Sequence, residues 1–145
     1  MVGKVLAVNI AEKRGQKKHN IDEAYLKADL GIGIDAHQGD WHRQISLLSL
    51  SSFEKMRAQG INVEYGGFAE NITVGELDLI KLPPGTRLKV GDSLLEITQI
   101  GKECHNQSCT IKKQAGSCIM PVEGVFARVL ESGWIKRGDS VEPIQ

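Results

Sequence analysis

Short apolar segments separated by glycine-containing turns are the feature that most restricts the fold of this chain. The 145 residues include 16 glycines and 4 prolines, which is typical of a chain that turns often. Strand-like segments without an alternating βαβ pattern predict a mainly β fold, a barrel or curled sheet with a few short peripheral helices. We expect strands over residues 2–10, 44–50, 71–74, 87–90 and 93–100, and a strand or close turn over residues 30–34.

A first helix is expected directly after the strand that ends at residue 50. Ser51 and Glu54 have the spacing of a capping box, and Gly60 suits the left-handed position that ends a helix. Residues 11–33 are polar and interrupted by glycine, so we interpret them mainly as loop. Within them, the basic run of residues 13–19 is interpreted as a solvated loop, with the rim of an anion site as a weaker alternative.

A second helix is expected over residues 122–132. Pro121 suits a first helical turn and Gly133 a helix end. The apolar residues that would form its buried face are Val125, Phe126, Val129 and Leu130. Arg128 would then lie near that face, which suggests an anionic partner.

Two similar segments, residues 89–94 and 136–141, each place a Gly-Asp turn before an apolar–polar strand. They predict two similar hairpin entries in which glycine supplies the positive φ. No linker or low-complexity tract divides the chain, so residues 1–145 are expected to form one domain.

Composition and charge argue against several classes of protein. The net charge is zero, whereas a general nucleic-acid binder carries an excess of Lys and Arg. No segment has the roughly 20 apolar residues of a membrane span, and residues 1–10 lack the pattern of a signal peptide. We therefore expect a cytoplasmic protein with reduced thiols. The phosphate-binding, dinucleotide-binding and nucleophile-elbow motifs are all missing.

The reactive side chains are densest in residues 101–118, directly after a predicted strand. Cys104 lies between Lys102 and His105, and positive charge would lower the pKa of its thiol and favour the thiolate. A thiolate is both a nucleophile and a ligand for soft metals. Cys104 is therefore the residue that we expect to carry the chemistry, while Cys109 is equally suited to function and burial and Cys118 suits burial.

Two other functions of these cysteines stay open. Cys104, His105, Cys109 and Cys118 have the residue types of a structural zinc site in a protein-interaction module, although their spacing is poor for one. Cys104 and Cys109 could also act as attacking and resolving thiols of a redox protein, at a spacing longer than that of a Cys-x-x-Cys pair.

Two further polar clusters suit a binding site. His37, His42 and Arg43 lie close together in a glycine-containing stretch before a strand, and Arg43 has the planar fork that matches a phosphate or carboxylate. Residues 66–72 contain two glycines, which allow close approach to a ligand or a neighbouring strand, followed by Asn71, which offers both donor and acceptor.

In combination, these segments resemble the MOSC family, named for the C-terminal domain of molybdenum-cofactor sulfurases. The resemblance covers nearly the whole chain. Its motifs are HQGDWHRQISLL at residues 37–48, GFAENITV at 67–74, GTRLKVGDSLLEITQIGKEC at 85–104, and residues 133–141. It implies a β-barrel-like fold with one central cysteine, best matched here by Cys104, with Cys109 as the alternative.

The resemblance also implies a connection to the molybdenum cofactor. Some members carry or transfer sulfur, and others hold the cofactor through the cysteine and reduce N-hydroxylated compounds, so enzymatic activity stays open. The expected partner is the cofactor itself, or a protein that bears it or donates sulfur. The expected cofactor-binding residues, lining a pocket for an anionic pterin phosphate, are His37, His42, Arg43, Asn71, Lys102, His105 and Arg128.

Overall fold

The computed structural model describes residues 2–13, 18–35, 38–39, 41–101 and 120–144. Its strands are β1 (Gly3–Ile10), β2 (His19–Ile21), β3 (Glu23–Lys27), β4 (Gly31–Ile32), β5 (Ile45–Ser49), β6 (Ile72–Gly75), β7 (Arg87–Val90), β8 (Ser93–Ile100), β9 (Val125–Glu131), β10 (Gly133–Lys136) and β11 (Ser140–Ile144). Its helices are α1 (Leu50–Ala58), the 3₁₀ turn η1 (Leu79–Lys81) and the short α3 (Met120–Glu123).

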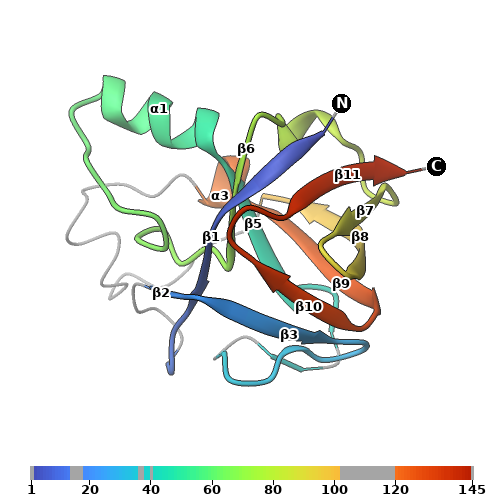
Figure 1. Ribbon diagram of the computed structural model, residues 1–145. Helices are drawn as coiled ribbons and strands as arrows, with labels where there is room; N and C mark the ends of the chain where they lie inside the picture. The colour runs from blue at the N-terminus through green and yellow to red at the C-terminus, as the bar shows by residue number, and fades with distance from the viewer. Residues whose placement is uncertain (1, 14–17, 36–37, 40, 102–119, 145) are drawn as a thin grey trace.

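The strands form a closed barrel in the order β11-β7-β8-β9-β5-β6-β1, and β1 pairs back onto β11 to complete it. Figure 1 shows these two strands side by side, with the ends of the chain near each other. β2 is added to β1 outside the closed ring, and β10, β3 and β4 form a second, smaller sheet. The prediction of a mainly β, barrel-like fold with short peripheral helices is confirmed.

The described strand pairs are antiparallel except for β5 and β6, which are parallel. Parallel neighbours cannot be joined by a tight hairpin and need a crossover connection. Helix α1 follows β5 directly and lies in this connection, outside the barrel (Figure 1). The crossover therefore determines where the peripheral helix packs.

Two groups of buried apolar side chains fill the molecule. The larger one fills the barrel interior, where Val125, Ala127 and Val129 of β9 point inward, and it extends to the smaller sheet through Ala24, Leu26, Ile32 and Ile135. The smaller one lies between α1 and the barrel and contains Leu48, Phe53, Met56, Phe68 and Phe126. Because Phe126 faces away from its neighbours Val125 and Ala127, β9 contributes to both groups.

The expected strands at residues 2–10, 44–50, 71–74, 87–90 and 93–100 are present with small differences at their ends. Both Gly-Asp turns are also confirmed, since Gly91 has φ of 52° and Gly138 has φ of 94° directly before β8 and β11. Gly31 has φ of 97°, and a Cβ there would lie 2.8 Å from the carbonyl oxygen of Gln44. The expected close backbone approach in residues 30–34 is therefore real.

The second expected helix, over residues 122–132, is wrong. Only residues 120–123 are helical, and most of the predicted segment is strand β9 between β8 and β5. Its apolar residues fit a period of two as well as a helical period, and its valines are β-branched. Pairing with two neighbouring strands decides between the two periods, which the local pattern leaves ambiguous.

Two smaller expectations are also wrong. The expectation of loop in residues 11–33 is wrong where β2 and β3 lie, because the alternating segment of β3 pairs with β10 from the far end of the chain, whereas β4 lies in the segment expected as a strand or close turn. Helix α1 begins at Leu50 with Ser49 as N-cap, so Ser51 does not cap it. The Ser49 hydroxyl instead donates to the Leu77 carbonyl and accepts from the Leu79 amide, which ties the helix start to η1.

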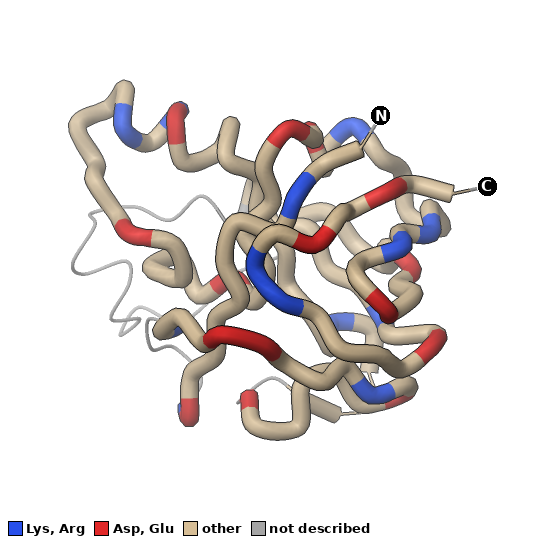
Figure 2. Tube along the Cα trace, in the orientation of Figure 1, with Lys and Arg blue, Asp and Glu red and all other residues tan. Residues whose placement is uncertain are grey.

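Charged residues of both signs are distributed along the described chain. Figure 2 shows Lys and Arg interspersed with Asp and Glu, in keeping with the zero net charge. Within the described residues, none of the helices has the length and apolar run that crossing a bilayer requires.

Truncating Leu47 tests the barrel core. Leu47 is fully buried on β5, so Leu47→Ala is expected to lower the free energy of unfolding by about 2–5 kcal/mol, through lost burial and an internal cavity. Urea denaturation measures this loss. Leu130→Ala is the matched control because Leu130 is 36% exposed on the outer face of β9, and it is expected to cost much less. Equal losses in the two variants would contradict the described packing.

Candidate functional site

The stretch of residues 41–44 lies across the outer side of β8 and β9. The Nε2 atom of His42 is 2.9 Å from Oε1 of Gln99, near the end of β8. The Thr98 hydroxyl is within hydrogen-bonding reach of the backbone carbonyls of His42 and Phe126. These contacts hold the stretch against the two strand segments on either side of the cysteine-containing residues 102–119.

Arg43 is held between two aromatic rings in this cluster. Its guanidinium carbon lies 4.7 Å from the centre of the Trp41 ring and 5.7 Å from that of Phe126. Such stacking positions a guanidinium without neutralising it. The Nε–H of Arg43 is buried and has no hydrogen-bond acceptor among the described residues. A fixed and incompletely satisfied cation of this kind is suited to an oxyanion that enters from outside.

Gln44 anchors the other end of the stretch. Its Oε1 atom accepts a hydrogen bond from the Val129 amide at 3.0 Å, and its backbone packs against Gly31. Its Nε2 atom is buried and lacks a partner in the part of the chain that the structure describes. Arg43 and Gln44 therefore place two unsatisfied donors at adjacent positions.

Asn71 holds three strands of the barrel together and is fully buried. Its Oδ1 atom accepts from the amide and the hydroxyl of Ser46, at 2.9 and 3.1 Å. Its Nδ2 atom donates to the Asn9 carbonyl at 3.1 Å. Its side chain thus connects the segment before β6 to β5 and β1, and these contacts are those of a residue that supports the barrel from within.

Glu70 is a fully buried carboxyl group that organises the turn before β6. It accepts hydrogen bonds from the Gly66 amide at 2.8 Å, the Thr73 hydroxyl at 2.7 Å and the Phe68 amide at 3.3 Å. Burial raises the pKa of Glu70 to about 7, although these hydrogen bonds act in the opposite direction. The Glu-Asn pair therefore has a structural use, with Glu70 shaping the turn and Asn71 joining the strands.

The expected solvated loop at residues 13–19 is wrong for Lys18, which is 4% exposed. Its Nζ atom lies 2.7 Å from Oδ1 of Asp35, and both side chains are almost completely buried. Gly66 packs directly on the backbone of Lys18, where a Cβ would lie 2.5 Å from its carbonyl oxygen. Gly66 thus allows two backbone segments to lie close together. Lys18 contacts both Asp35 and Gly66, so the basic run, the segment before the His42–Arg43 stretch and residues 66–72 meet in one region.

The described residues on both sides of the cysteine segment are held together. The Gly101 amide donates to the Gly124 carbonyl at 2.7 Å, which brings the end of β8 beside the start of β9. Glu123 accepts from the Ser52 hydroxyl at 2.6 Å and from Lys55 at 2.7 Å, so α3 is tied to α1. Burial alone would raise the pKa of Glu123, but the hydrogen bonds from Lys55 and Ser52 lower it overall.

Several expected site residues lie outside the described residues, namely His37, Lys102, Cys104, His105 and Cys109. Cys118 does too, so the zinc and dithiol alternatives are not tested by the geometry. Among the side chains that the structure does describe, no three His, Cys, Asp or Glu come together as a metal site.

Of the expected binding residues that are described, His42 and Arg43 are brought together, whereas Asn71 and Arg128 are not part of their cluster. Arg128 is on strand β9 and not on a helix, 3.6 Å from Oδ1 of Asp29. It shares the outer face of β9 with Phe126, two residues away.

Sequence reasoning did not identify Thr98, Gln99 and Phe126 as parts of this cluster. Thr98 and Gln99 break the apolar character of β8 near its end, which is a usable signal. Phe126 gives no such signal, because its contact with Arg43 depends on how the stretch before β5 crosses β9.

Glu70 should make stability depend on pH. Because the pKa of Glu70 rises from 4.5 to about 7 on folding, its contribution to stability is fully present below pH 4.5 and is lost as the pH rises to 7. The loss amounts to about 3 kcal/mol. Glu70→Gln, which cannot titrate, should flatten this part of the profile of unfolding free energy against pH. Glu64→Gln, at an exposed position, should keep the slope of the original protein; a Glu70→Gln profile with that same slope would refute the assignment.

Asn71→Ala should lower the free energy of unfolding by about 2–4 kcal/mol, because it leaves the buried Ser46 amide and Asn9 carbonyl without their partner. Thermal and urea denaturation report the loss. Asn62→Ala removes the same group at an exposed position and should cost less than about 0.5 kcal/mol. If the two variants are equally stable, Asn71 does not join the strands.

Solved structures share this fold across the full chain. The YuaD protein of Bacillus subtilis matches with a TM-score of 0.82 and 18% identity, over 100% of this chain and 98% of that one. YiiM of Geobacillus stearothermophilus matches with a TM-score of 0.77 and 18% identity, over 99% of this chain and 75% of that one. YiiM of Escherichia coli matches with a TM-score of 0.69 and 15% identity, over 99% and 68%. At these identities the likeness concerns the fold.

The sequence itself matches a family model. No curated protein sequence gives a significant match. The model of the MOSC domain, however, matches residues 34–142, which include the stretch before β5, the Glu70–Asn71 turn, β8 and the cysteine segment. The chain therefore belongs to the MOSC domain family, which is associated with the molybdenum cofactor.

Proposed function

We propose that this protein is a molybdenum-cofactor module in which the thiolate of Cys104 holds the metal or carries its sulfur. Arg43 would bind the anionic pterin phosphate, with His42 beside it. The observation that carries the proposal is the Nε–H of Arg43, buried between two aromatic rings without an acceptor among the described residues. The unpaired Nε–H of Arg43 fits an anionic group, which is what the cofactor would bring.

The covalent chain supports a link between Arg43 and Cys104. Gln99, which contacts His42, is two residues before Gly101, and Cys104 follows Gly101 by three residues. Three trans peptide units span at most about 11 Å. This tether limits how far Cys104 can lie from the end of β8, and we propose that one ligand contacts both Arg43 and Cys104.

The chain's own residues would bind and orient the cofactor and would stabilise the Cys104 thiolate. Lys102 and His105 would favour the Cys104 thiolate through their positive charge. His37, six residues before Arg43 in the sequence, would add a donor or proton carrier. Asn71 would act indirectly, by holding Ser46 and the start of β5. Arg128 would add positive potential on the outer face of β9. When bound, the cofactor would supply a thiophilic molybdenum centre with redox chemistry.

This role requires a reduced thiol, and the cytoplasm keeps thiols reduced. We therefore propose that the protein works in the cytoplasm. We also propose that residues 1–145 form a single domain. Its partners would be the cofactor and a protein that bears it or donates sulfur. Two activities share the same thiolate: cofactor sulfuration, with Cys104 as a sulfur carrier, and cofactor-bound reduction of N-hydroxylated compounds.

Metal, pterin and intact-mass analysis of protein purified from cells that make the cofactor tests the proposal. Molybdenum with pterin would indicate cofactor binding, and a mass increase of one sulfur atom would indicate carriage. Cys104→Ser is expected to abolish either signal. Arg43→Gln is expected to lower cofactor occupancy about tenfold, because it removes a charge-assisted contact to an anion.

Matched controls separate the site from general effects. Cys118→Ser and Arg57→Gln, the latter on the exposed side of α1, should leave both signals unchanged. Loss of signal in Cys109→Ser but not in Cys104→Ser would make Cys109 the functional thiol. Stoichiometric zinc with unfolding by a chelator, or a Cys104–Cys109 disulfide after mild peroxide, would replace the proposal by one of the two alternatives.

A further inference from the structure

A groove of about 530 Å³ runs over the outer side of β1, in a gap between its strand partners. β11 pairs with Gly3 and Lys4, and β2 pairs with residues 8–10, so the strand between them has room beside it. Asn20, Ile21 and Asp22 border the groove on one side, and Arg137 and Gly138 on the other. The volume lies in the range of small-molecule sites, roughly 300–1,000 Å³.

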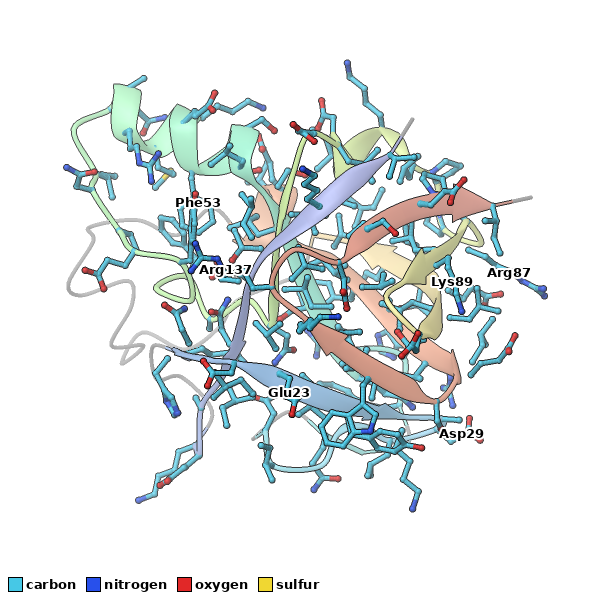
Figure 3. The ribbon with its side chains drawn as sticks, in the orientation of Figure 1. Glu23, Asp29, Phe53, Arg87, Lys89 and Arg137 are labelled. Carbon is cyan, nitrogen blue, oxygen red and sulfur yellow. The ribbon has the colours of Figure 1, made fainter. Side chains whose placement is uncertain are left out.

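Arg137 gives this groove a positive charge without a counter-ion. Arg137 follows β10 in the turn before β11 and lies beside β1 (Figure 3). The acid of that turn, Asp139, is already bound by Lys136, with 2.9 Å between Nζ and Oδ1. Within the described chain, Arg137 makes no ion pair or side-chain hydrogen bond, and Lys4, which also lines the groove, makes none either. The two cations therefore line a shared space in which neither forms an ion pair, although Asp22 also lines the groove.

The rest of the groove suits an apolar, planar body. Its floor is formed by residues 5–8 of β1, including the half-buried Leu6, and by Ile21 of β2. Tyr65 adds an aromatic wall that is firmly placed, because its ring packs edge to face against Phe53 at 5.3 Å and its carbonyl accepts from Asn20 at 3.2 Å. An apolar floor with a few convergent polar groups is the usual composition of a ligand site.

We propose that this groove binds a small organic oxyanion, with the phosphate or carboxylate on Arg137 and Lys4 and a planar apolar part on Leu6 and Tyr65. Asp22 closes the groove on the β2 side and repels a second negative charge, so the ligand carries its charge at one end.

This groove is distinct from the Arg43 cluster. It lies over β1 and uses residues of β2 and of the turn after β10, whereas Arg43 lies over β8 and β9. Binding in the groove needs neither the cofactor nor a cysteine. The two proposals can therefore fail independently.

Titration of the ¹⁵N-labelled full chain with phenyl phosphate, benzoate and neutral phenol tests the proposal. We expect at least one of the two anions to shift the amide resonances of Leu6, Ala7, Asn20 and Gly138 in a saturable way. The anion that binds more tightly shows whether the groove prefers a phosphate or a carboxylate. Arg137→Gln and Lys4→Gln should each weaken that binding, Arg137→Gln by about tenfold through loss of a charge-assisted contact. Asp22→Asn should strengthen it, because the repulsion is removed.

Arg87→Gln is the matched control, since Arg87 is an exposed arginine on β7, away from the groove (Figure 3). It should bind the anion like the unmodified chain. Equal weakening by Arg87→Gln and Arg137→Gln, equal binding of phenol, non-saturable shifts, or shifts confined to residues 41–44 would each overturn the proposal. All four groove and control residues are exposed, so loss of folding does not confuse the result.

Discussion

The side-chain hydrogen bonds of Asn71 are the interaction on which most of this structure depends. They join β1, β5 and β6 at the place where the parallel pair begins. A parallel pair has no hairpin to determine its register, so a buried side chain that recognises a single position on the neighbouring strand is an effective substitute. The Ser46 amide is that position, and the residues immediately before it include Arg43 and Gln44.

Several polar groups near Asn71 are buried, and burial opposes their ionised forms. Glu70 is buried without a described cationic partner and relies on two amides and a hydroxyl, so its ionised form is destabilised there. Lys18 and Asp35 are also buried, but as an ion pair. A buried pair of this kind gives little net stability, yet it strongly disfavours any arrangement that separates the two charges. Glu70 and the Lys18–Asp35 pair therefore determine the conformation of the turns and add little to the free energy of unfolding.

A further set of hydrogen bonds lies where β8 ends and β9 begins. The Gly101–Gly124 hydrogen bond and the ties of Glu123 to α1 hold the described ends of the cysteine segment. The stretch of residues 41–44 is bound to those strands by Thr98 and Gln99, with Arg43 stacked on Phe126. The barrel thus presents a fixed cation beside the strand that leads to Cys104.

The amino-acid sequence alone was enough to predict the barrel class, most strands, the Gly-Asp turns and the family. Alternating apolar residues and positive-φ glycines are local properties that can be recognised without the tertiary structure. The strand at Val125–Glu131 was not predictable, since its apolar spacing fits two periods and only β8 and β5 on either side select one. The burial of Lys18, the side-chain hydrogen bonds of Asn71 and the stacking of Arg43 on Phe126 were likewise decided by tertiary structure. Each depends on a partner at least two strands or a loop away in the chain, and no local pattern specifies which distant group will satisfy a polar side chain.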